Sequence, residues 1–284
     1  MFKKLILGLV IFISLVSLLD NENLFLKYKK YLDVFFRRSS IFYIWPHLNE
    51  KIPFNDLDYH KDSSLVFITY GQSNAANSGE LKSQIQPHKN VYMVFNENIY
   101  KYKDPSLGSD GIGNSVWGLL GEKLVFQNNE EVKNVFFTNT AVGGEKIENL
   151  ISSEFEYLTF FLNQFKMTLK KFEKVDGILF HQGESNRYNI KSYQKSFMTF
   201  IDSVRSVSNV PIYLSLASYC NGSFNNKLLQ IQNNLIENNE NILRGPNSDI
   251  LGSEFRHDDC HFNEEGLIQL ANLWSEAIFK SSEL

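Results

Sequence analysis

Residues 65–75 of the 284-residue chain read LVFITYGQSNA, a run of β-branched and aromatic residues that ends in a glycine and a short polar turn. Such a run is typical of a buried β-strand, and the glycine permits a sharp turn directly after it. The turn places a serine, Ser73, just beyond the carboxyl end of the expected strand. In an open α/β sheet this is the edge where active sites gather. Ser73 is therefore a candidate nucleophile.

Runs of the same kind recur along the chain and alternate with longer amphipathic stretches. The other expected strands are 90–95, 134–140, 177–182 and 211–218, with 248–252 as a further candidate. The expected helices cover about 114–128, 152–173, 189–207, 224–239 and 263–281. This alternation favours βαβ units around a parallel sheet. The sequence therefore predicts one α/β domain over residues 61–284.

Composition excludes several classes of protein. The content of 43% hydrophobic residues is enough to build a full core, which excludes a disordered chain or a disulfide-stapled miniprotein. The 28 Lys and Arg residues against 32 Asp and Glu leave a net charge of −4, so nucleic acid is not an expected partner. The two cysteines lack the C-x-x-C spacing of a cysteine-based zinc site.

The N-terminus has the charge order of an export signal. Lys3 and Lys4 precede an uninterrupted apolar run at 5–19, which is somewhat short of the ~20 residues that span a bilayer untilted. No small-x-small cleavage site follows, so we expect residues 1–21 to be a membrane anchor or uncleaved signal and residues 22–60 to be a juxtamembrane linker. The expected location is extracytoplasmic, membrane-anchored or, if the signal is cleaved, secreted. Basic residues on the distal side of the run leave its orientation open.

Two polar motifs follow other expected strands. AVGGE at 141–145 contains paired glycines, which either bring a backbone N–H against a ligand oxygen or simply supply a turn. HQGESN at 181–186 ends an apolar strand with a dense set of polar side chains, which is costly unless they bind something.

The segment DDCHFNEEG, residues 258–266, supplies a candidate general base. An Asp three residues before a His can hold the imidazole through its Nδ1–H and leave Nε2 to take a proton from a serine hydroxyl. Of the six histidines, His261 alone has both Asp258 at this spacing and a helix start behind it.

Taken together and in this order, GQSN, AVGGEKI, HQGESN and DDCHF resemble the SGNH-hydrolase superfamily and, within it, the sialate O-acetylesterase-like and carbohydrate acetylesterase branch. The resemblance covers residues 64–281. It implies a three-layer α/β/α, flavodoxin-like fold with a five-stranded parallel sheet. It also implies that Ser73 is the nucleophile, His261 the base and Asp258 the residue that orients the base.

The resemblance implies three oxyanion donors. These are the backbone N–H of Ser73, the N–H of Gly144 with Gly143 as the alternative, and the side-chain amide of Gln182. Gln182 takes this role because HQGESN stands where the wider superfamily has a Gly-x-Asn-Asp pattern.

Four further residues in or beside these motifs are candidates for contacting the substrate or supporting the site. We expect Asn74 to contact substrate, and Glu184 to act either on substrate or as a structural hydrogen-bond acceptor. Arg187 either contacts substrate or simply lies on the surface. His181 occupies a position where relatives usually carry Trp or Tyr, which leaves the character of one pocket wall open.

The activity implied by the resemblance is removal of O-acetyl groups from a sialate or another surface or extracellular glycan, through an acyl-enzyme and without a metal or organic cofactor. A glycan O-acetyltransferase would use the same triad, with a sugar hydroxyl in place of water. A catalytically silent glycan-binding module and an esterase for other esters or lipids are further alternatives. The sequence does not define the oligomeric state.

The two cysteines are expected to form a disulfide. Cys220 follows the strand at 211–218, and Cys260 lies in the Asp258–His261 turn, which must approach the same sheet edge to reach Ser73. In an exported protein such a pair oxidises if its Cα atoms come within about 7 Å. Two unrelated free thiols are the alternative.

Overall fold

The structure is a computed structural model that describes residues 47, 50–81, 90–127 and 132–282. The expected anchor or signal at 1–21 and most of the expected linker at 22–60 lie outside these residues. Among the helices that are described, none combines the length and the apolar character needed to cross a membrane.

An eight-stranded mixed sheet forms the centre of the fold, with the order β1-β4-β3-β5-β2-β6-β7-β8. Six neighbouring strands, from β3 to β8 in that order, are parallel, whereas β4 and β1 pair antiparallel at one edge. The strands are β1 (Lys51–Ile52), β2 (Ser64–Gly71), β3 (Val91–Phe95), β4 (Asn98–Lys101), β5 (Asn134–Asn139), β6 (Gly177–His181), β7 (Ile212–Leu216) and β8 (Ile242–Asn247).

The prediction of a five-stranded parallel sheet is therefore wrong at both edges. At one edge, Asn96 and Glu97 both have positive φ, which makes the two-residue turn of a hairpin and adds β4. At the other edge the sixth parallel strand is β8, not the expected 248–252. There the Asn247 side chain caps a short 3-10 helix by accepting from the Asp249 N–H, so the chain leaves the sheet.

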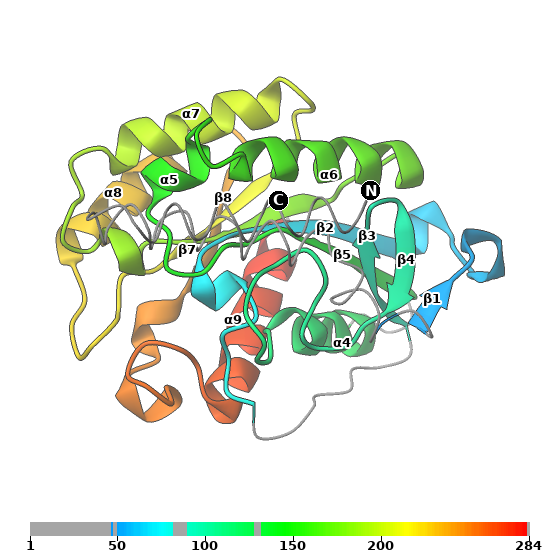
Figure 1. The fold of residues 1–284 in the computed structure, drawn as a ribbon, viewed down its shortest axis with the longest axis horizontal. Helices are drawn as coiled ribbons and strands as arrows, with labels where there is room; N and C mark the ends of the chain where they lie inside the picture. Colours follow the sequence, from blue (N-terminus) through cyan, green and yellow to red (C-terminus); the bar gives the residue numbers. More distant parts are fainter. Residues whose placement is uncertain (1–46, 48–49, 82–89, 128–131, 283–284) are drawn as a thin grey trace, which may run out of the picture.

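Helices cover both faces of the sheet, which gives three layers (Figure 1). The α-helices are α4 (Trp117–Gln127), α5 (Ile147–Ile151), α6 (Tyr157–Phe172), α7 (Tyr193–Arg205), α8 (Asn226–Glu237) and α9 (Glu264–Ser282). The 3-10 helices are η2 (Phe54–Asp56), η3 (Lys61–Ser63), η4 (Ser73–Ala75), η5 (Glu184–Asn186), η6 (Ser248–Ile250) and η7 (Ser253–Phe255). Helices α5 to α8 lie on one face, and α4 and α9 lie on the other.

The central strand β2 shows why its sequence is apolar throughout. Val66, Ile68 and Tyr70 pack into the core beneath α5 to α8, whereas Phe67 packs into the core beneath α4 and α9. Side chains alternate between the two faces of a strand, and both faces of this sheet are covered by helices. Because both faces of β2 are buried, neither face needs polar residues.

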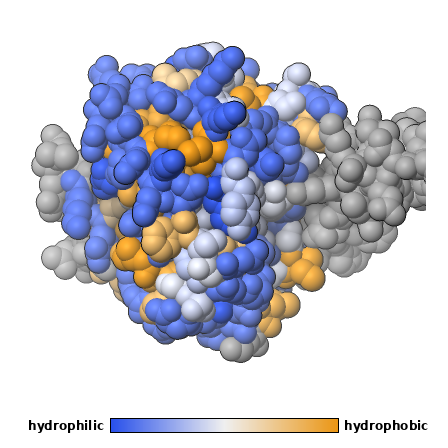
Figure 2. All heavy atoms as spheres, turned by 90° about the vertical axis from the view of Figure 1, so that its left-hand side faces the viewer, coloured by the Kyte–Doolittle hydropathy of each residue, from blue (hydrophilic) through white to orange (hydrophobic). Residues whose placement is uncertain are grey.

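Gly71 ends β2 where the backbone of β6 comes very close. Its φ is +141°, and a Cβ built on it would lie 2.0 Å from the carbonyl oxygen of His181. The same carbonyl accepts the N–H of Gln72 at 3.0 Å. Only glycine fits this turn, which delivers the GQSN residues to the carboxyl edge of the sheet. Figure 2 views that side of the molecule, where mostly polar side chains surround smaller apolar patches.

Replacing Gly71 by alanine is expected to lower the free energy of unfolding by about 2 kcal/mol or more, because the new Cβ clashes with backbone and the φ is strained. Gly252→Ala is the matched control, since its Cβ would meet only the flexible end of the Glu254 side chain. Denaturant unfolding of both variants measures the difference. Equal stability of the two would show that the close approach at Gly71 is misplaced.

Candidate active site

The loop that carries His261 is closed on itself by backbone hydrogen bonds. Arg256 and Phe262 form an antiparallel bridge, and the N–H of His257 donates to the carbonyl of His261 at 3.0 Å. Inside this loop, Asp258 Oδ2 lies 2.6 Å from His261 Nδ1. The loop therefore fixes the imidazole and the carboxylate against each other.

Asp258 is held in its ionised form. Partial burial alone would raise the pKa of its carboxyl, but hydrogen bonds from the His261 N–H and ring and from the Cys260 N–H lower that pKa to about 2. A carboxylate accepts hydrogen bonds only, so the ring nitrogen that faces it carries the proton. Nε2 of His261 is then the basic nitrogen.

Ser73 begins the 3-10 helix η4 directly after β2 and is 5% exposed. The Trp117 indole N–H donates to the Ala75 carbonyl at 2.8 Å and anchors this turn to α4. The Ser73 hydroxyl makes no hydrogen bond to any described residue, His261 included. The structure thus leaves this hydroxyl open to a further partner.

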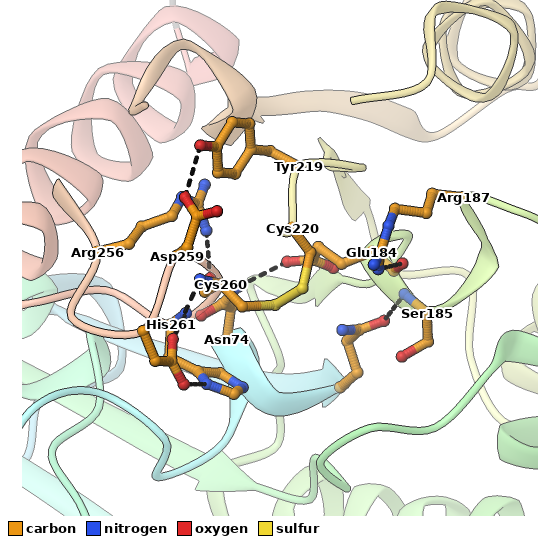
Figure 3. The surroundings of a disulfide bond; sticks show 12 residues. Asn74, Glu184, Ser185, Arg187, Tyr219, Cys220, Arg256, Asp259, Cys260 and His261 are labelled. Atoms are coloured by element: carbon orange, nitrogen blue, oxygen red, sulfur yellow. Dashed lines mark hydrogen bonds and ion pairs between the residues drawn. A yellow bond between two sulfur atoms is a disulfide. The ribbon is translucent and has the colours of Figure 1, made fainter. Parts of the chain in front are cut away.

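Asn74 joins the Ser73 turn to the His261 loop. Its side-chain amide donates to the Cys260 carbonyl at 3.3 Å, so the residue after Ser73 contacts the residue before His261 (Figure 3). The Glu80 N–H also donates to the Phe262 carbonyl at 3.0 Å. The two candidate catalytic residues therefore come from loops that are hydrogen-bonded to each other.

Glu184 is a buried carboxylate, 1% exposed, at the end of β6. Asn74 Nδ2 donates to its Oε1 at 2.7 Å, and His181 Nε2 lies 3.2 Å from the same oxygen. Burial would raise the pKa of Glu184, but His181 and Asn74 hold that pKa well below its ordinary value. The side-chain amide of Asn74 and the carboxylate of Glu184 are both hydrogen-bonded to internal residues. This favours the structural role for Glu184 over contact with substrate.

The glycine motif presents two different backbone amides. The Gly143 N–H donates to Asp110 Oδ1 at 2.7 Å, so that amide is already engaged. Gly144 has φ +69°, is exposed, and its N–H meets no acceptor within the described residues. A Cβ on Gly143 would lie 3.6 Å from that of Ser73, which places the motif beside the serine. Sequence reasoning missed Asp110, whose glycine-rich surroundings carry no specific signal.

The buried Gln182 side chain forms hydrogen bonds to residues of all three strand-end motifs. It is fully buried, and its Nε2 lies near three acceptors: the Glu145 carbonyl at 3.2 Å, Gln72 Oε1 at 3.2 Å and Asn186 Oδ1 at 2.7 Å. Gln72 Oε1 also accepts the Ser185 N–H at 2.9 Å. The Gln72 amide nitrogen donates to no described residue. Gln72 lies within GQSN, but nothing in the sequence distinguished its side chain from that of Gln182.

Arg187 and Tyr188 follow the third motif at its outer side. Arg187 Nη1 donates to the Glu184 carbonyl at 2.9 Å, and its guanidinium carbon lies 4.4 Å from the centre of the Tyr188 ring. The Nε atom of Arg187 has no hydrogen-bond partner in the described part of the chain. Tyr188 itself is 80% exposed. The pair presents a cation and an aromatic ring beside the motif.

The predicted disulfide is confirmed. Cys220 and Cys260 are bonded, with their Cα atoms 4.3 Å apart (Figure 3). Beside the bond, the Asn221 N–H donates to the Asp259 carbonyl at 2.9 Å, and the Tyr219 hydroxyl donates to Asp259 Oδ1 at 2.9 Å. The loop after β7 is thus tied covalently and by hydrogen bonds to the loop that carries His261.

Comparison with known proteins identifies one family and a shared fold. The family model described as carbohydrate esterase, sialic acid-specific acetylesterase, matches residues 63–280. A solved structure of a protein from Arabidopsis thaliana superposes with a TM-score of 0.62 at 15% identity, covering 77% of this chain and 98% of that one. The structure of NanS superposes with a TM-score of 0.56 at 14% identity, covering 78% and 98%. At these identities the two structures show the fold alone. No curated protein matches the sequence.

Replacing both Cys220 and Cys260 by serine is expected to lower the free energy of unfolding by ~2–4 kcal/mol, because the bond closes a loop between residues 40 positions apart. Chemical denaturation of oxidised wild type and the double variant gives this difference. Thiol titration of the unreduced, denatured wild type should find no free thiol. Two titratable thiols there would mean that the bond does not form.

Proposed function

Because the chain belongs to the carbohydrate esterase family of sialic acid-specific acetylesterases, we propose that it removes O-acetyl groups from a carbohydrate with Ser73, His261 and Asp258 as its catalytic triad. Membership of the family makes it a carboxylic ester hydrolase. The observation that carries the triad is the hydrogen bond of 3.3 Å from Asn74 to the Cys260 carbonyl, because it joins the neighbours of the nucleophile and the base.

The proposed chemistry passes through an acyl-enzyme. Ser73 Oγ attacks the ester carbonyl while His261 Nε2 takes the hydroxyl proton, and the ionised Asp258 stabilises the imidazolium. The tetrahedral intermediate collapses, the sugar oxygen leaves with the proton from His261, and acetyl remains on the serine. Water repeats the sequence and releases acetate. No step requires a metal or an organic cofactor.

Three donors are proposed for the oxyanion. The backbone N–H of Ser73 and the unengaged N–H of Gly144 supply two, and the engagement of the Gly143 N–H by Asp110 supports Gly144 over its neighbour. The third is a side-chain amide. The internal acceptors around Gln182 favour Gln72, with Gln182 holding Gln72 Oε1 in place. Loss of one such donor typically costs ~2.7–4 kcal/mol in transition-state stabilisation.

The proposed substrate is an O-acetylated sialic acid or a related anionic glycan. A guanidinium matches a sugar carboxylate in charge and geometry, and Arg187 directly follows HQGESN and donates to the Glu184 carbonyl. The exposed Tyr188 ring offers an apolar face for the sugar. The apolar run at 5–19 supports an extracytoplasmic or membrane-anchored location, where such glycans occur.

Ser73→Ala and His261→Ala are each expected to lower kcat for a small activated acetyl ester by at least about 10⁴-fold, because they remove the nucleophile and its base. Asp258→Asn should lower kcat by a similar or smaller factor. Acetate release by the purified variants measures the effect, with unfolding curves to confirm that the fold is intact.

The matched control is Ser203→Ala, which removes a half-buried hydroxyl from α7 that donates to the Thr199 carbonyl, and it should leave turnover unchanged. Substantial activity in Ser73→Ala would exclude this serine as the nucleophile. Acetyl transfer to a glycan acceptor in place of acetate release would identify the glycan O-acetyltransferase that shares the same acyl-enzyme.

Arg187→Gln is expected to lower kcat/KM for an O-acetylated sialic acid by about tenfold or more, since a charged hydrogen bond contributes ~1.5–3 kcal/mol. Turnover of a small neutral acetyl ester should not change. Lys195→Gln removes an exposed positive charge from α7 and serves as the control. An equal loss with both substrates would mean that Arg187 acts on the fold and not on the substrate carboxylate.

A further inference from the structure

The His261 loop carries a second imidazole that the proposed mechanism does not use. His257 lies beside His261, with the ring centres 6.0 Å apart and the planes inclined by 27°. One possible ligand atom from each of His257, Asp258 and His261 lies within 4.8 Å of the others. We propose that these three residues bind one Zn²⁺ ion, and that the bound ion reversibly inhibits the esterase.

The donor set is one that zinc prefers. Two imidazole nitrogens and a carboxylate oxygen, with a fourth position left for water, form a common three-ligand zinc site. Zinc–ligand bonds of ~2.0–2.2 Å in a tetrahedral site place ligand atoms about 3.3 Å apart. The candidate ligand atoms now lie within 4.8 Å of one another, so side-chain movement is needed to reach that spacing. His257 can move inwards because it is exposed and its one side-chain hydrogen bond in the described chain is a long one, 3.3 Å to the Ser78 carbonyl.

The backbone around the three ligands is already held in place. The Arg256–Phe262 bridge and the hydrogen bond between His257 and His261 close the loop, and the disulfide at Cys260 ties it to the loop after β7. Zinc binding therefore orders only side chains, which lowers its entropic cost.

The positive charge of Arg256, in the same loop, has internal partners. The Arg256 guanidinium is buried and donates to the carbonyls of Leu251, Ser248 and Cys260. The carboxylates of Glu184, Asp249 and Asp259 interact electrostatically with the same guanidinium. One of the three proposed ligands is a carboxylate, which favours binding of a cation.

Inhibition follows from either mode of coordination by His261. Zinc on Nε2 occupies the lone pair that would take the serine proton. Zinc on Nδ1 needs the lone pair of that nitrogen, so the single ring proton moves from Nδ1 to Nε2, where it prevents Nε2 from acting as a base. The inhibitory part of this inference rests on the proposed function, whereas zinc binding does not.

Isothermal calorimetry with Zn²⁺ tests the binding site on the purified full chain. Wild type and Ser73→Ala should each bind one ion, because the serine is not a ligand. His257→Gln should bind at least about tenfold more weakly. His60→Gln removes another exposed histidine, one paired with Asp58 outside the site, and should bind like wild type. Absence of binding at millimolar zinc, or equal binding by His257→Gln and wild type, would overturn the proposal.

Hydrolysis of a small acetyl ester tests the consequence. Zinc should inhibit wild type over the concentration range in which it binds, and a chelator should restore turnover. His257→Gln should match wild type without zinc and need about tenfold more zinc for the same inhibition. Full activity of zinc-saturated wild type would overturn the inhibitory role. Zinc binding with the expected His257 dependence, in a protein that hydrolyses no acetyl ester, would confirm the site and refute the proposed function.

Discussion

The buried charge of Glu184 is the constraint on which the arrangement of the candidate site depends. An ionised carboxylate in the interior is stable only with close partners, and Glu184 takes His181 from the end of β6 and Asn74 from the turn after β2. Asn74 extends the same network to the Cys260 carbonyl in the loop before α9. Satisfying one internal charge thus aligns three segments that are far apart in the sequence. An apolar residue at 184 would leave the Asn74 amide without its best acceptor.

The sheet supplies the rest of the alignment. Because β2 lies between β5 and β6 and runs parallel to both, the motifs that follow these strands emerge at one edge. The close contact of Gly71 with His181 sets how sharply the chain turns there. Strand pairing brings the motifs to the same edge, and the polar network then sets their detailed contacts.

Sequence patterns predicted the elements whose signals are local. Continuous apolar runs located β2, β3, β5, β6 and β7, because strands covered on both faces show no alternation. Trp117 lies in the expected helix at 114–128, and in the structure it is completely buried and packs against Trp274. By contrast, β8 reads ILRGPN, where a glycine and a proline conceal a strand at the sheet edge. The hairpin to β4 depends on positive φ at Asn96 and Glu97, and glutamate, unlike asparagine, does not favour that conformation.

For the site, the sequence identified the residue types, but it could not decide which of two similar residues supplies an oxyanion donor. Whether Gly143 or Gly144 has an unengaged amide depends on Asp110, which lies more than thirty residues away. Gln72 and Gln182 are both buried, and tertiary contacts decide which of the two amide nitrogens has internal acceptors. Such choices are made by tertiary contacts, and no spacing rule contains them. The pairing of Asp258 with His261 was predictable because a single short loop contains both partners.

The position of α9 determines when, during synthesis, the chain can first bring Ser73 and His261 together. The loop with His261 leads directly into α9, whose Trp274 packs against Trp117 of α4 with ring centres 5.6 Å apart. The nucleophile candidate Ser73, by contrast, leaves the ribosome almost two hundred residues earlier. A nascent chain therefore carries the serine long before it carries the histidine. The proposed triad is completed only when α9 has emerged and packed against the core that it shares with α4.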